Sequence, residues 1–259
     1  MSKRLLAIDI GNTHTVIGVF SGDIVERSWR VSTDTSKTAD EWGVYLTTLF
    51  SFDTIRPEDL IGACISCVVP PTRTILAQMC KKYFDIDPIV VGPGIKTGLS
   101  IKSDNPREVG ADRIVNAVAA YTEHGGPLII IDVGTATTFC AISKNGEYLG
   151  GAIAPGMRVA AEALASRTAQ LPRIEFELPR KAIGKDTVSC MQSGIVLGYM
   201  ELISGMVRRI KAELDSNAKV IATGGMVPLL TELDSVIDVY EPDLMLKGLK
   251  IIYERNASP

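Results

Sequence analysis

Short apolar runs of strand length alternate along the chain with longer segments in which apolar positions recur at helical spacing. In the first half, the runs that predict strands occupy residues 5–8, 16–20, 23–31, 62–69 and 89–91. Thr38-Ala39-Asp40-Glu41 is a capping-box pattern, which predicts a helix that continues to about Phe50. Pro70-Pro71 ends the fourth run, and a second helix is predicted from there to about Tyr83. The first half is therefore predicted to run β-β-β-α-β-α-β.

Gly125-Gly126-Pro127 punctuates the chain, and a similar pattern starts again after it. Strands are predicted at residues 128–131, 138–142, 148–153 and 219–222, and helices at 156–167, 187–214 and 243–253. Residues 171–185 are rich in proline and charge, which predicts an exposed, irregular segment. The pattern as a whole predicts two α/β lobes, residues 1–124 and 125–259, with an active site in the cleft between them.

Two of the predicted strands lead into the same kind of turn, one in each half of the chain. The first turn is Asp9-Ile10-Gly11-Asn12-Thr13, and the second is Asp132-Val133-Gly134-Thr135-Ala136. The glycines permit a tight turn and a close approach to a ligand, while amides and threonine hydroxyls are donors for phosphate oxygens. A carboxylate repels phosphates unless a cation lies between them, so both aspartates fit the role of metal or metal-water ligands. An ordinary β-hairpin with a capping aspartate is the alternative for one copy, but two copies favour a duplicated phosphate-binding turn.

A third acidic residue follows a glycine at the predicted start of a helix. Gly110-Ala111-Asp112-Arg113 precedes good helical periodicity, which predicts a helix over residues 111–121. Asp112 therefore lies in the first turn, where its carboxylate serves either as a helix cap or as a general base that takes a proton from an attacking hydroxyl. Arg113 is a candidate partner for a substrate carboxylate. The residues alone leave both interpretations of Asp112 open.

Three further glycine-bearing segments have a plain and a functional interpretation. The loop 92–98 matches neither a dinucleotide fingerprint nor a Walker A loop, and its Lys96 is either a phosphate contact or a solvated lysine. Ala222-Thr223-Gly224-Gly225 is either a strand-to-helix turn or a place where adenine or ribose lies against the backbone. Gly194 and Gly198 share one helix face, which indicates close helix packing in the core or at a subunit interface.

Composition narrows the class of protein. The chain has 259 residues, of which 46% are hydrophobic and 22% charged, as is ordinary for a soluble globular enzyme. Its net charge of -3 gives no basic footprint for nucleic acid. The N-terminal apolar stretch stops at Asp9, too soon for an export signal, and no apolar run reaches membrane-spanning length. We therefore expect a cytoplasmic protein that contacts neither nucleic acid nor membrane.

The cysteines and histidines predict neither a disulfide framework nor a histidine-rich metal site. The number of cysteines is five, and an odd count without an export signal argues against paired bridges. Cys64 and Cys67 have a metal-like spacing, but a strand places them on opposite faces, and core packing is the simpler role. His14 and His124 are the only histidines, too few for a histidine-rich zinc site.

The ordered set of motifs resembles the type III pantothenate kinases over essentially the whole chain. The motifs are Asp9-x-Gly11-Asn12-Thr13, Gly110-Ala111-Asp112-Arg113, Asp132-x-Gly134-Thr135-x-Thr137 and Thr223-Gly224-Gly225, with Gly92-Pro93-Gly94, Lys96-Thr97-Gly98 and the stretch 184–194 between them. The resemblance implies an α/β fold of two ribonuclease-H-like lobes, shared by acetate and sugar kinases, heat-shock chaperone ATPases and actin. It also implies transfer of the γ-phosphate of ATP to the primary hydroxyl of pantothenate, the first step of coenzyme A synthesis.

The resemblance also implies roles for individual residues. The first phosphate loop, as the ATP-binding segment, would comprise Asp9, Ile10, Gly11, Asn12, Thr13, His14, Thr15 and Val16, with Thr135 as a further ATP contact. Gly110, Ala111, Asp112, Arg113 and Thr187 resemble pantothenate contacts, with Asp112 as the proton acceptor. Asp132 resembles the ligand of a monovalent cation, K⁺ or NH₄⁺, and Asp9 is expected to hold Mg²⁺ through water. The family resemblance further implies a homodimer.

One position departs from the family pattern. Where the family commonly has a tyrosine before Asp-Asn-Pro, this chain has Ser103, which supplies neither the same apolar wall nor the same reach. Ser103 supports one alternative, a non-enzymatic regulator that binds nucleotide on this fold, but the presence of both acidic turns and of Gly110-Ala111-Asp112-Arg113 argues against it. A separate alternative is a sugar or acetate kinase relative with a different acceptor, and this chain lacks room for the large insertions usual in those relatives. We therefore expect the pantothenate kinase.

Overall fold

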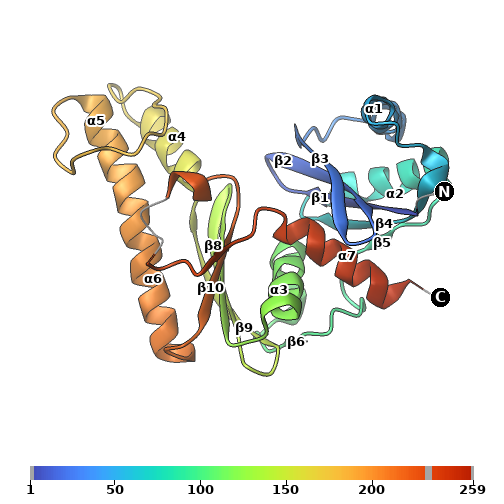
Figure 1. The fold of residues 1–259 in the computed structure, drawn as a ribbon. Helices are drawn as coiled ribbons and strands as arrows, with labels where there is room; N and C mark the ends of the chain where they lie inside the picture. Colours follow the sequence, from blue (N-terminus) through green and yellow to red (C-terminus); the bar gives the residue numbers. More distant parts are fainter. Residues whose placement is uncertain (1–2, 231–234, 258–259) are drawn as a thin grey trace. The chain divides into compact units, whose positions relative to one another are not determined.

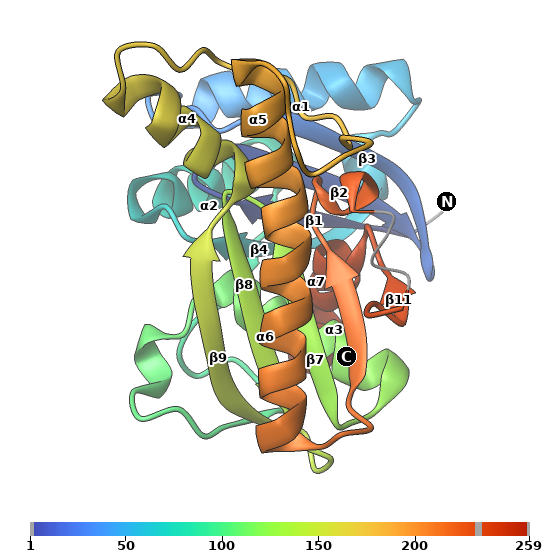
Figure 2. The same cartoon turned by 90° about the vertical axis from the view of Figure 1, so that its left-hand side faces the viewer.

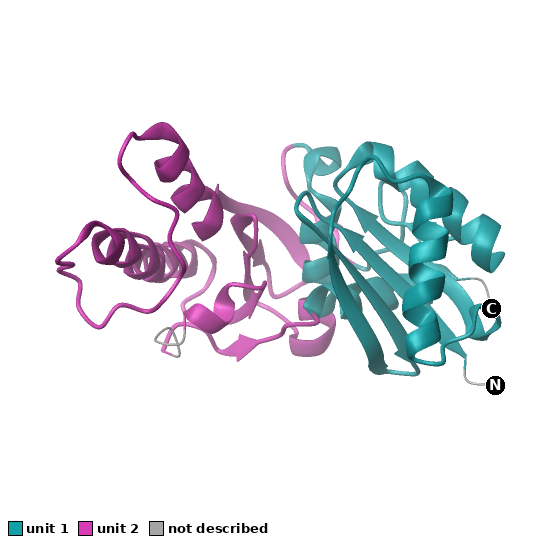
Figure 3. Ribbon diagram, turned by 90° about the horizontal axis from the view of Figure 1, so that it is seen from above, with its two compact units in different colours: residues 1–98, 105–119, 244–259 teal, residues 99–104, 120–243 magenta. Residues whose placement is uncertain are grey.

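The computed structural model describes residues 3–230 and 235–257. Contacts divide the chain into two compact units, each with its own sheet (Figure 3). Unit 1 comprises Met1–Gly98, Asn105–Ala119 and Leu244–Pro259, and unit 2 comprises Leu99–Asp104 and Ala120–Asp243. The chain thus leaves unit 1 and returns to it for its last helix.

The sheet of unit 1 has five strands in the order β3-β2-β1-β4-β5. Their bounds are β1 (Arg4–Ile10), β2 (His14–Ser21), β3 (Ile24–Ser32), β4 (Leu60–Cys67) and β5 (Ile89–Val90). The first three strands form an antiparallel meander, and β4 and β5 then run parallel to β1. The β-β-β-α-β-α-β order predicted for the first half is confirmed.

Helices pack on both faces of the sheet of unit 1 (Figure 1). They are α1 (Ala39–Phe52), α2 (Pro70–Phe84), α3 (Ala111–His124), which continues into unit 2, and α7 (Leu244–Asn256). Leu6, Ile8 and Ile10 of β1 share one buried cluster with α1 and α2. The other face of the sheet packs against α7 at glycine positions, which have no side chain: a Cβ added to Gly18 would lie 2.7 Å from Leu246. Ile17 and Val19, on either side of Gly18 in β2, belong to the first cluster, so alternate residues of one strand bury against different helices.

The sheet of unit 2 has six strands in the order β11-β10-β7-β8-β9-β6. Their bounds are β6 (Ser100–Ile101), β7 (Leu128–Val133), β8 (Ala136–Ile142), β9 (Glu147–Pro155), β10 (Lys219–Thr223) and β11 (Val239–Tyr240). Again three strands form an antiparallel meander, and β10 and β11 run parallel to β7. Apart from the short β6, the topology repeats that of unit 1, so the internal repeat read from the sequence extends to the whole sheet.

One long helical stretch covers a face of the second sheet, as Figure 2 shows for α6 over β7 and β8. It consists of α5 (Thr187–Gln192), a π-helical segment η3 (Ser193–Leu197) and α6 (Gly198–Leu214). With α4 (Met157–Arg167) it closes a core that includes Ile131, Phe139, Met157 and Ile203. The predicted helix 187–214 is confirmed, but its π-helical interruption was not foreseen.

The remaining regular elements are single turns of 3₁₀ helix. They are η1 (Pro57–Asp59), η2 (Pro106–Glu108) and η4 (Val227–Leu229). Together with β6 and β11 they were missing from the sequence prediction, because segments of two or three residues carry no measurable periodicity.

Three sequence expectations need correction. The units do not coincide with the predicted lobes 1–124 and 125–259, because α7 packs on the first sheet through Leu246 and Tyr253. The segment 171–185 is irregular as predicted, but it is not fully exposed, because Ile174, Phe176 and Leu178 pack partly buried against the core of unit 2.

The third expectation is that no apolar run reaches membrane-spanning length. The 28-residue helical stretch Thr187–Leu214 reaches a mean hydropathy of 1.2 over 18 residues and is, by length and composition, long and apolar enough to cross a membrane. Since 44% of that window is buried and core helices pass the same test, this is weak evidence for a membrane span.

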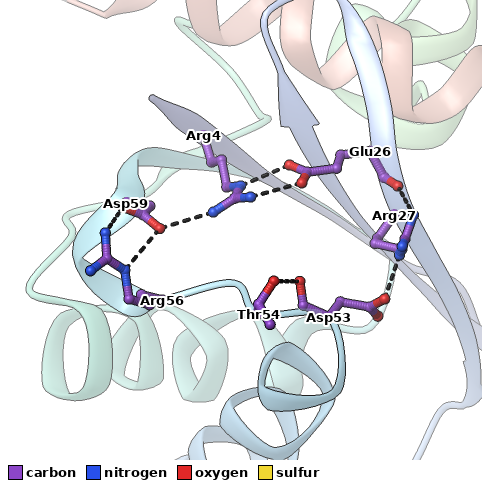
Figure 4. A network of polar contacts seen from close by, with 7 residues as sticks. All are labelled: Arg4, Glu26, Arg27, Asp53, Thr54, Arg56 and Asp59. Atoms are coloured by element: carbon purple, nitrogen blue, oxygen red, sulfur yellow. Dashed lines mark hydrogen bonds and ion pairs between the residues drawn. The ribbon is translucent and has the colours of Figure 1, made fainter. Parts of the chain in front are cut away.

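A charged network secures the start of β1 in unit 1 (Figure 4). Arg4 donates to both carboxylate oxygens of Glu26 at 2.7 Å and to Asp59 at 2.9 Å, and Arg56 donates to Asp59 at 3.0 Å. The Arg4 guanidinium lowers the pKa of Glu26, and Arg56, with help from Arg4, lowers the pKa of Asp59. Both carboxyl groups are therefore ionised in the folded protein at neutral pH.

Candidate active site

The first glycine turn joins β1 to β2 in unit 1. The amide of Gly11 donates to the His14 carbonyl at 3.0 Å, and a Cβ on Gly11 would lie 3.0 Å from that same oxygen. Asn12, Thr13 and His14 are exposed, whereas Ile10 and Thr15 are fully buried. The turn is thus a tight backbone loop that presents its central residues to solvent, as a phosphate-binding loop requires.

Thr33, just after β3, holds this turn from outside it. Its hydroxyl donates to the Gly11 carbonyl at 2.7 Å and lies 3.0 Å from the hydroxyl of Thr15. Its amide donates to the Thr13 carbonyl at 3.0 Å. The sequence prediction missed Thr33, because a threonine after a third strand carries no motif. The Thr15 side chain, predicted as an ATP contact, lies against Thr33 and is fully buried.

Asp9 occupies the penultimate position of β1, in register with Val16 of β2 and Ser66 of β4. Its Oδ1 atom is buried. Burial raises the pKa of the nearby Cys67 thiol, and the Asp9 carboxylate raises it further. The Cys67 thiol therefore stays protonated at neutral pH.

The second glycine turn joins β7 to β8 in unit 2 and repeats the first with one residue fewer. The amide of Gly134 donates to the Ala136 carbonyl at 3.0 Å, as Gly11 does to His14. The amide of Gly156 donates to the Thr135 carbonyl at 2.9 Å, as Thr33 does to Thr13. Gly156 packs against the carbonyls of Gly134 and Thr135, where a Cβ has no room. Thr135 is exposed at the tip.

Asp132 lies beside a second glycine turn of the same unit. Thr223 at the end of β10 pairs in register with Asp132, and the chain then turns at Gly224 with φ +103°. A Cβ on Gly224 would lie 2.6 Å from the Val133 carbonyl oxygen and 2.7 Å from Asp132 Oδ1. The predicted adenosine motif and the predicted cation ligand are therefore neighbours, and the turn needs glycine for both its space and its backbone conformation.

Asp112 lies in the first turn of α3, as the sequence predicted. Its Oδ1 accepts a hydrogen bond from the Arg113 amide at 2.8 Å and packs closely over Gly110. The bond satisfies one of the free backbone amides in the first turn of the helix, and it orients the side chain without using its second oxygen. Both interpretations of Asp112 therefore fit this geometry, since a capped carboxylate remains a proton acceptor.

Thr187 begins α5 in unit 2, directly after the capping residue Asp186. The Ser189 amide donates to Asp186 at 2.9 Å, and the serine side chain completes a capping box. Exposed Thr187 lines a pocket of about 640 Å³ whose wall includes Leu164, Lys185 and Met191. The structure thus places the predicted substrate contact at an open pocket.

The loop 92–98 is anchored by the end of α7. The Lys96 amide donates to Asn256 at 2.9 Å, Asn256 donates back to the Lys96 carbonyl at 2.9 Å, and Arg255 donates to the Thr97 carbonyl. The Lys96 backbone therefore has a structural role, while its side chain is exposed.

Comparison with known proteins gives matches in sequence. A family model described as type III pantothenate kinase matches residues 5–209. A type III pantothenate kinase of Geobacillus kaustophilus (strain HTA426) is 53% identical over 253 residues, which is 98% of each chain.

Solved structures share the fold at much lower identity. A putative 2-dehydro-3-deoxygalactonokinase from Sinorhizobium meliloti gives a TM-score of 0.59 at 12% identity, covering 98% of both chains. The ethanolamine utilization protein EutJ from Carboxydothermus hydrogenoformans gives a TM-score of 0.57 at 14% identity, covering 96% of this chain and 89% of its own. These similarities show that the chain shares the α/β fold of these proteins. By family model and by sequence identity, the chain belongs to the type III pantothenate kinases, the ATP-using enzymes that phosphorylate pantothenate in coenzyme A biosynthesis.

Proposed function

We propose that both glycine turns bind phosphate groups of ATP, and that Asp112 activates the acceptor hydroxyl of pantothenate. The observation that carries the proposal is the duplicated geometry. Asp9 precedes Gly11 and Asp132 precedes Gly134 at corresponding places in two repeated sheets. A turn of the same kind in each unit, with matching hydrogen bonds, fits the binding of phosphate groups by both turns.

The ATP contacts follow from this assignment. Residues 9–16 form the first phosphate loop, with Asn12, Thr13 and His14 as its exposed members. Thr135 is the exposed contact of the second turn, and Thr223-Gly224-Gly225 receives the adenosine. We therefore assign the first phosphate loop to unit 1, and the second phosphate loop with the adenosine motif to unit 2.

The residues at the two aspartates fit the cations that a kinase needs. Asp132 Oδ1 and the Val133 carbonyl oxygen converge on Gly224, and oxygen pairs of this kind suit K⁺ or NH₄⁺. Asp9 offers a carboxylate at the edge of the first turn, which suits Mg²⁺ held through water. When bound, the two cations supply neutralisation of phosphate charge.

Gly110, Ala111, Asp112, Arg113 and Thr187 are the proposed pantothenate contacts. Asp112, held by the Arg113 amide, keeps one oxygen for the proton of the primary hydroxyl. Arg113 pairs with the pantothenate carboxylate. Phosphoryl transfer itself needs little covalent work, so positioning of the hydroxyl and in-line approach to the γ-phosphate account for most of the rate.

We further propose a homodimer that works in the cytoplasm, where ATP is abundant. Leu164, which lines the pocket at Thr187, is 40% exposed. Two large apolar side chains next in sequence to lining residues are exposed as well, Val188 by 40% and Ile183 by 82%. Gly194 and Gly198 on the adjoining helix have nothing within 4 Å of an added Cβ. A second copy of this chain covers such a surface by close helix packing, which also accounts for the high hydropathy of the long helix without a membrane.

The test is ADP release by the purified protein with ATP and Mg²⁺, with and without pantothenate, in potassium and in sodium. We expect ADP only when pantothenate is present, phosphopantothenate in equal amount by mass spectrometry, and a faster rate in potassium. ADP release without dependence on pantothenate would contradict the acceptor assignment and favour a regulator or another acceptor. Equal rates of ADP release in potassium and in sodium would contradict only the proposed role of Asp132 as a cation ligand.

A further inference from the structure

A cluster with metal-ligating chemistry lies in unit 2, apart from the glycine turns. Within residues 3–230 and 235–257, it is the one group of three or more such side chains. It comprises Glu123 and His124, from the last turn of α3, and Glu241, which follows β11. Each side chain offers one ligand atom, and the three atoms lie within 4.8 Å of one another. Two segments far apart in the sequence thus bring an imidazole and two carboxylates together.

The imidazole of His124 faces the carboxylates with an atom that has no hydrogen bond. Its Nε2 is buried and makes no hydrogen bond, and it lies 3.9 Å from a carboxylate oxygen of Glu123. That separation is too long for a hydrogen bond. It matches two ligands of one ion, since two bonds of about 2.1 Å place the ligand atoms roughly 3 to 4 Å apart. A buried polar atom without a partner is costly, and an ion between these groups removes the cost.

The other ring nitrogen meets a competing cation. Nδ1 of His124 lies 3.4 Å from Nζ of Lys219, at the start of β10. An ammonium only donates, so this contact makes Nδ1 the acceptor and leaves the ring proton on Nε2. A metal ion at Nε2 needs the proton on Nδ1 instead. Lys219 is exposed and free to turn toward solvent, but it must do so before the ion binds.

We propose that Glu123, His124 and Glu241 form a binding site for a divalent transition-metal ion of the zinc and cobalt class. Two carboxylates and a neutral imidazole balance the ion's charge, and an imidazole ligand favours these metals over Mg²⁺ and Ca²⁺. The bound ion ties the end of α3 to the segment after β11 and so stabilises unit 2. The site is separate from the cation positions proposed at Asp9 and Asp132, and it binds without ATP or pantothenate.

The test uses the full chain without a histidine tag, with Cys190→Ser to remove an exposed thiol that binds soft metals. The chain has two histidines, so imidazole nitrogen NMR gives two ring systems that His124→Ala assigns. On addition of Zn²⁺ we expect the Nε2 signal of His124 to shift, the proton to appear on Nδ1, and His14 to stay unmoved. At a free ion concentration of 100 Kd, Tm should rise by about 5–10 °C.

Variants separate a metal site from a cluster of ion pairs. His124→Ala and Glu241→Gln should weaken zinc binding at least about tenfold. Lys219→Met should strengthen it several-fold because the competing hydrogen bond is gone, and Glu58→Gln, an exposed carboxylate of unit 1, should change nothing. Three results would overturn the proposal: a His124 ring unmoved by millimolar zinc, unchanged zinc binding in His124→Ala, or weaker binding in Lys219→Met.

Discussion

The carboxylate of Asp132 lies against the backbone of Gly224, so closely that an added Cβ would come within 2.7 Å of its Oδ1 atom. The same Cβ would come within 2.6 Å of the Val133 carbonyl oxygen. The turn that we assign to adenosine and the carboxylate that we assign to a monovalent cation therefore share one wall. A change in either residue should disturb both functions.

Gly224→Ala tests this shared wall. The methyl group must displace Asp132 or the backbone, and φ of +103° strains any side chain there. We expect kcat/KM for ATP to fall by about 10–100-fold, as displacement of binding groups by about 1 Å does, and the potassium stimulation to weaken with it. The matched control is Gly150→Ala, where φ is +117° but nothing lies within 4 Å of an added Cβ. If the two variants lose the same activity, backbone strain rather than the shared wall is responsible.

Thr33→Val tests whether the first phosphate turn depends on its external support. The variant loses the hydrogen bond to Gly11 and leaves the buried hydroxyl of Thr15 without its neighbour. We expect KM for ATP to rise by about 3–10-fold and the protein to lose about 1–2 kcal/mol of stability. Thr48→Val, which removes an exposed helix hydroxyl bonded to Val44, is the control and should leave KM unchanged. An unchanged KM in Thr33→Val would show that the turn is held by its backbone alone.

Arg4→Met tests the charged network at the start of β1. The pKa values of Glu26 and Asp59 are lowered in the folded state, so both groups stabilise the fold above their unfolded pKa values of about 4. That stability is lost as the pH falls through about 4 toward the folded pKa values. The variant should therefore melt several degrees below the wild type at pH 7, and the difference should shrink below pH 4.

Arg27→Met is the matched control for Arg4→Met. The Arg27 side chain is 54% exposed where that of Arg4 is 12% exposed, so its pair with Asp53 should contribute little. A difference between wild type and Arg4→Met that is independent of pH would show that packing, not charge, explains the loss.

Ile183→Glu tests the proposed dimer surface. A charge at this 82% exposed position should weaken association of two copies, which light scattering across a concentration series measures. Phe52→Glu, at a 79% exposed position in unit 1, is the control and should leave the mass unchanged. A wild type that is monomeric at all concentrations would contradict the homodimer, and equal effects of both variants would contradict this surface.

Much of the fold could be predicted from the sequence because its signals are local. The capping box at Thr38 forms as predicted: the Thr38 amide donates to Glu41 at 2.7 Å and the Glu41 amide to Thr38 at 3.3 Å. The packing of α7 in unit 1 could not be predicted, because the apolar face of an amphipathic helix does not indicate which sheet it packs on. Gly18 and Gly62 leave room for Leu246 and Tyr253 of α7. These glycines are far from α7 in the sequence, so the contacts are apparent only in the folded chain.

In the candidate site, too, some residues could be predicted from the sequence and others could not. The repeated Asp-x-Gly pattern can be recognised from the sequence at Asp9 to Gly11 and at Asp132 to Gly134. In the structure, both turns make matching hydrogen bonds. Thr33 and the contact between Asp132 and Gly224 depend on strand register, which joins residues far apart in the chain. Sequence patterns therefore identify residues that carry the chemistry more readily than residues that hold them in place.

The catalytic role of Asp112 is the central claim, and one variant tests it most directly. Asp112→Asn keeps the shape of the side chain and an oxygen for the Arg113 amide, but it cannot take a proton. Single-turnover phosphopantothenate formation and the Kd for ATP should be measured together on the same preparation. We predict a rate lower by on the order of a hundredfold or more with the Kd for ATP nearly unchanged. A rate close to that of the wild type would contradict the role of Asp112 as the base and leave it as a helix cap.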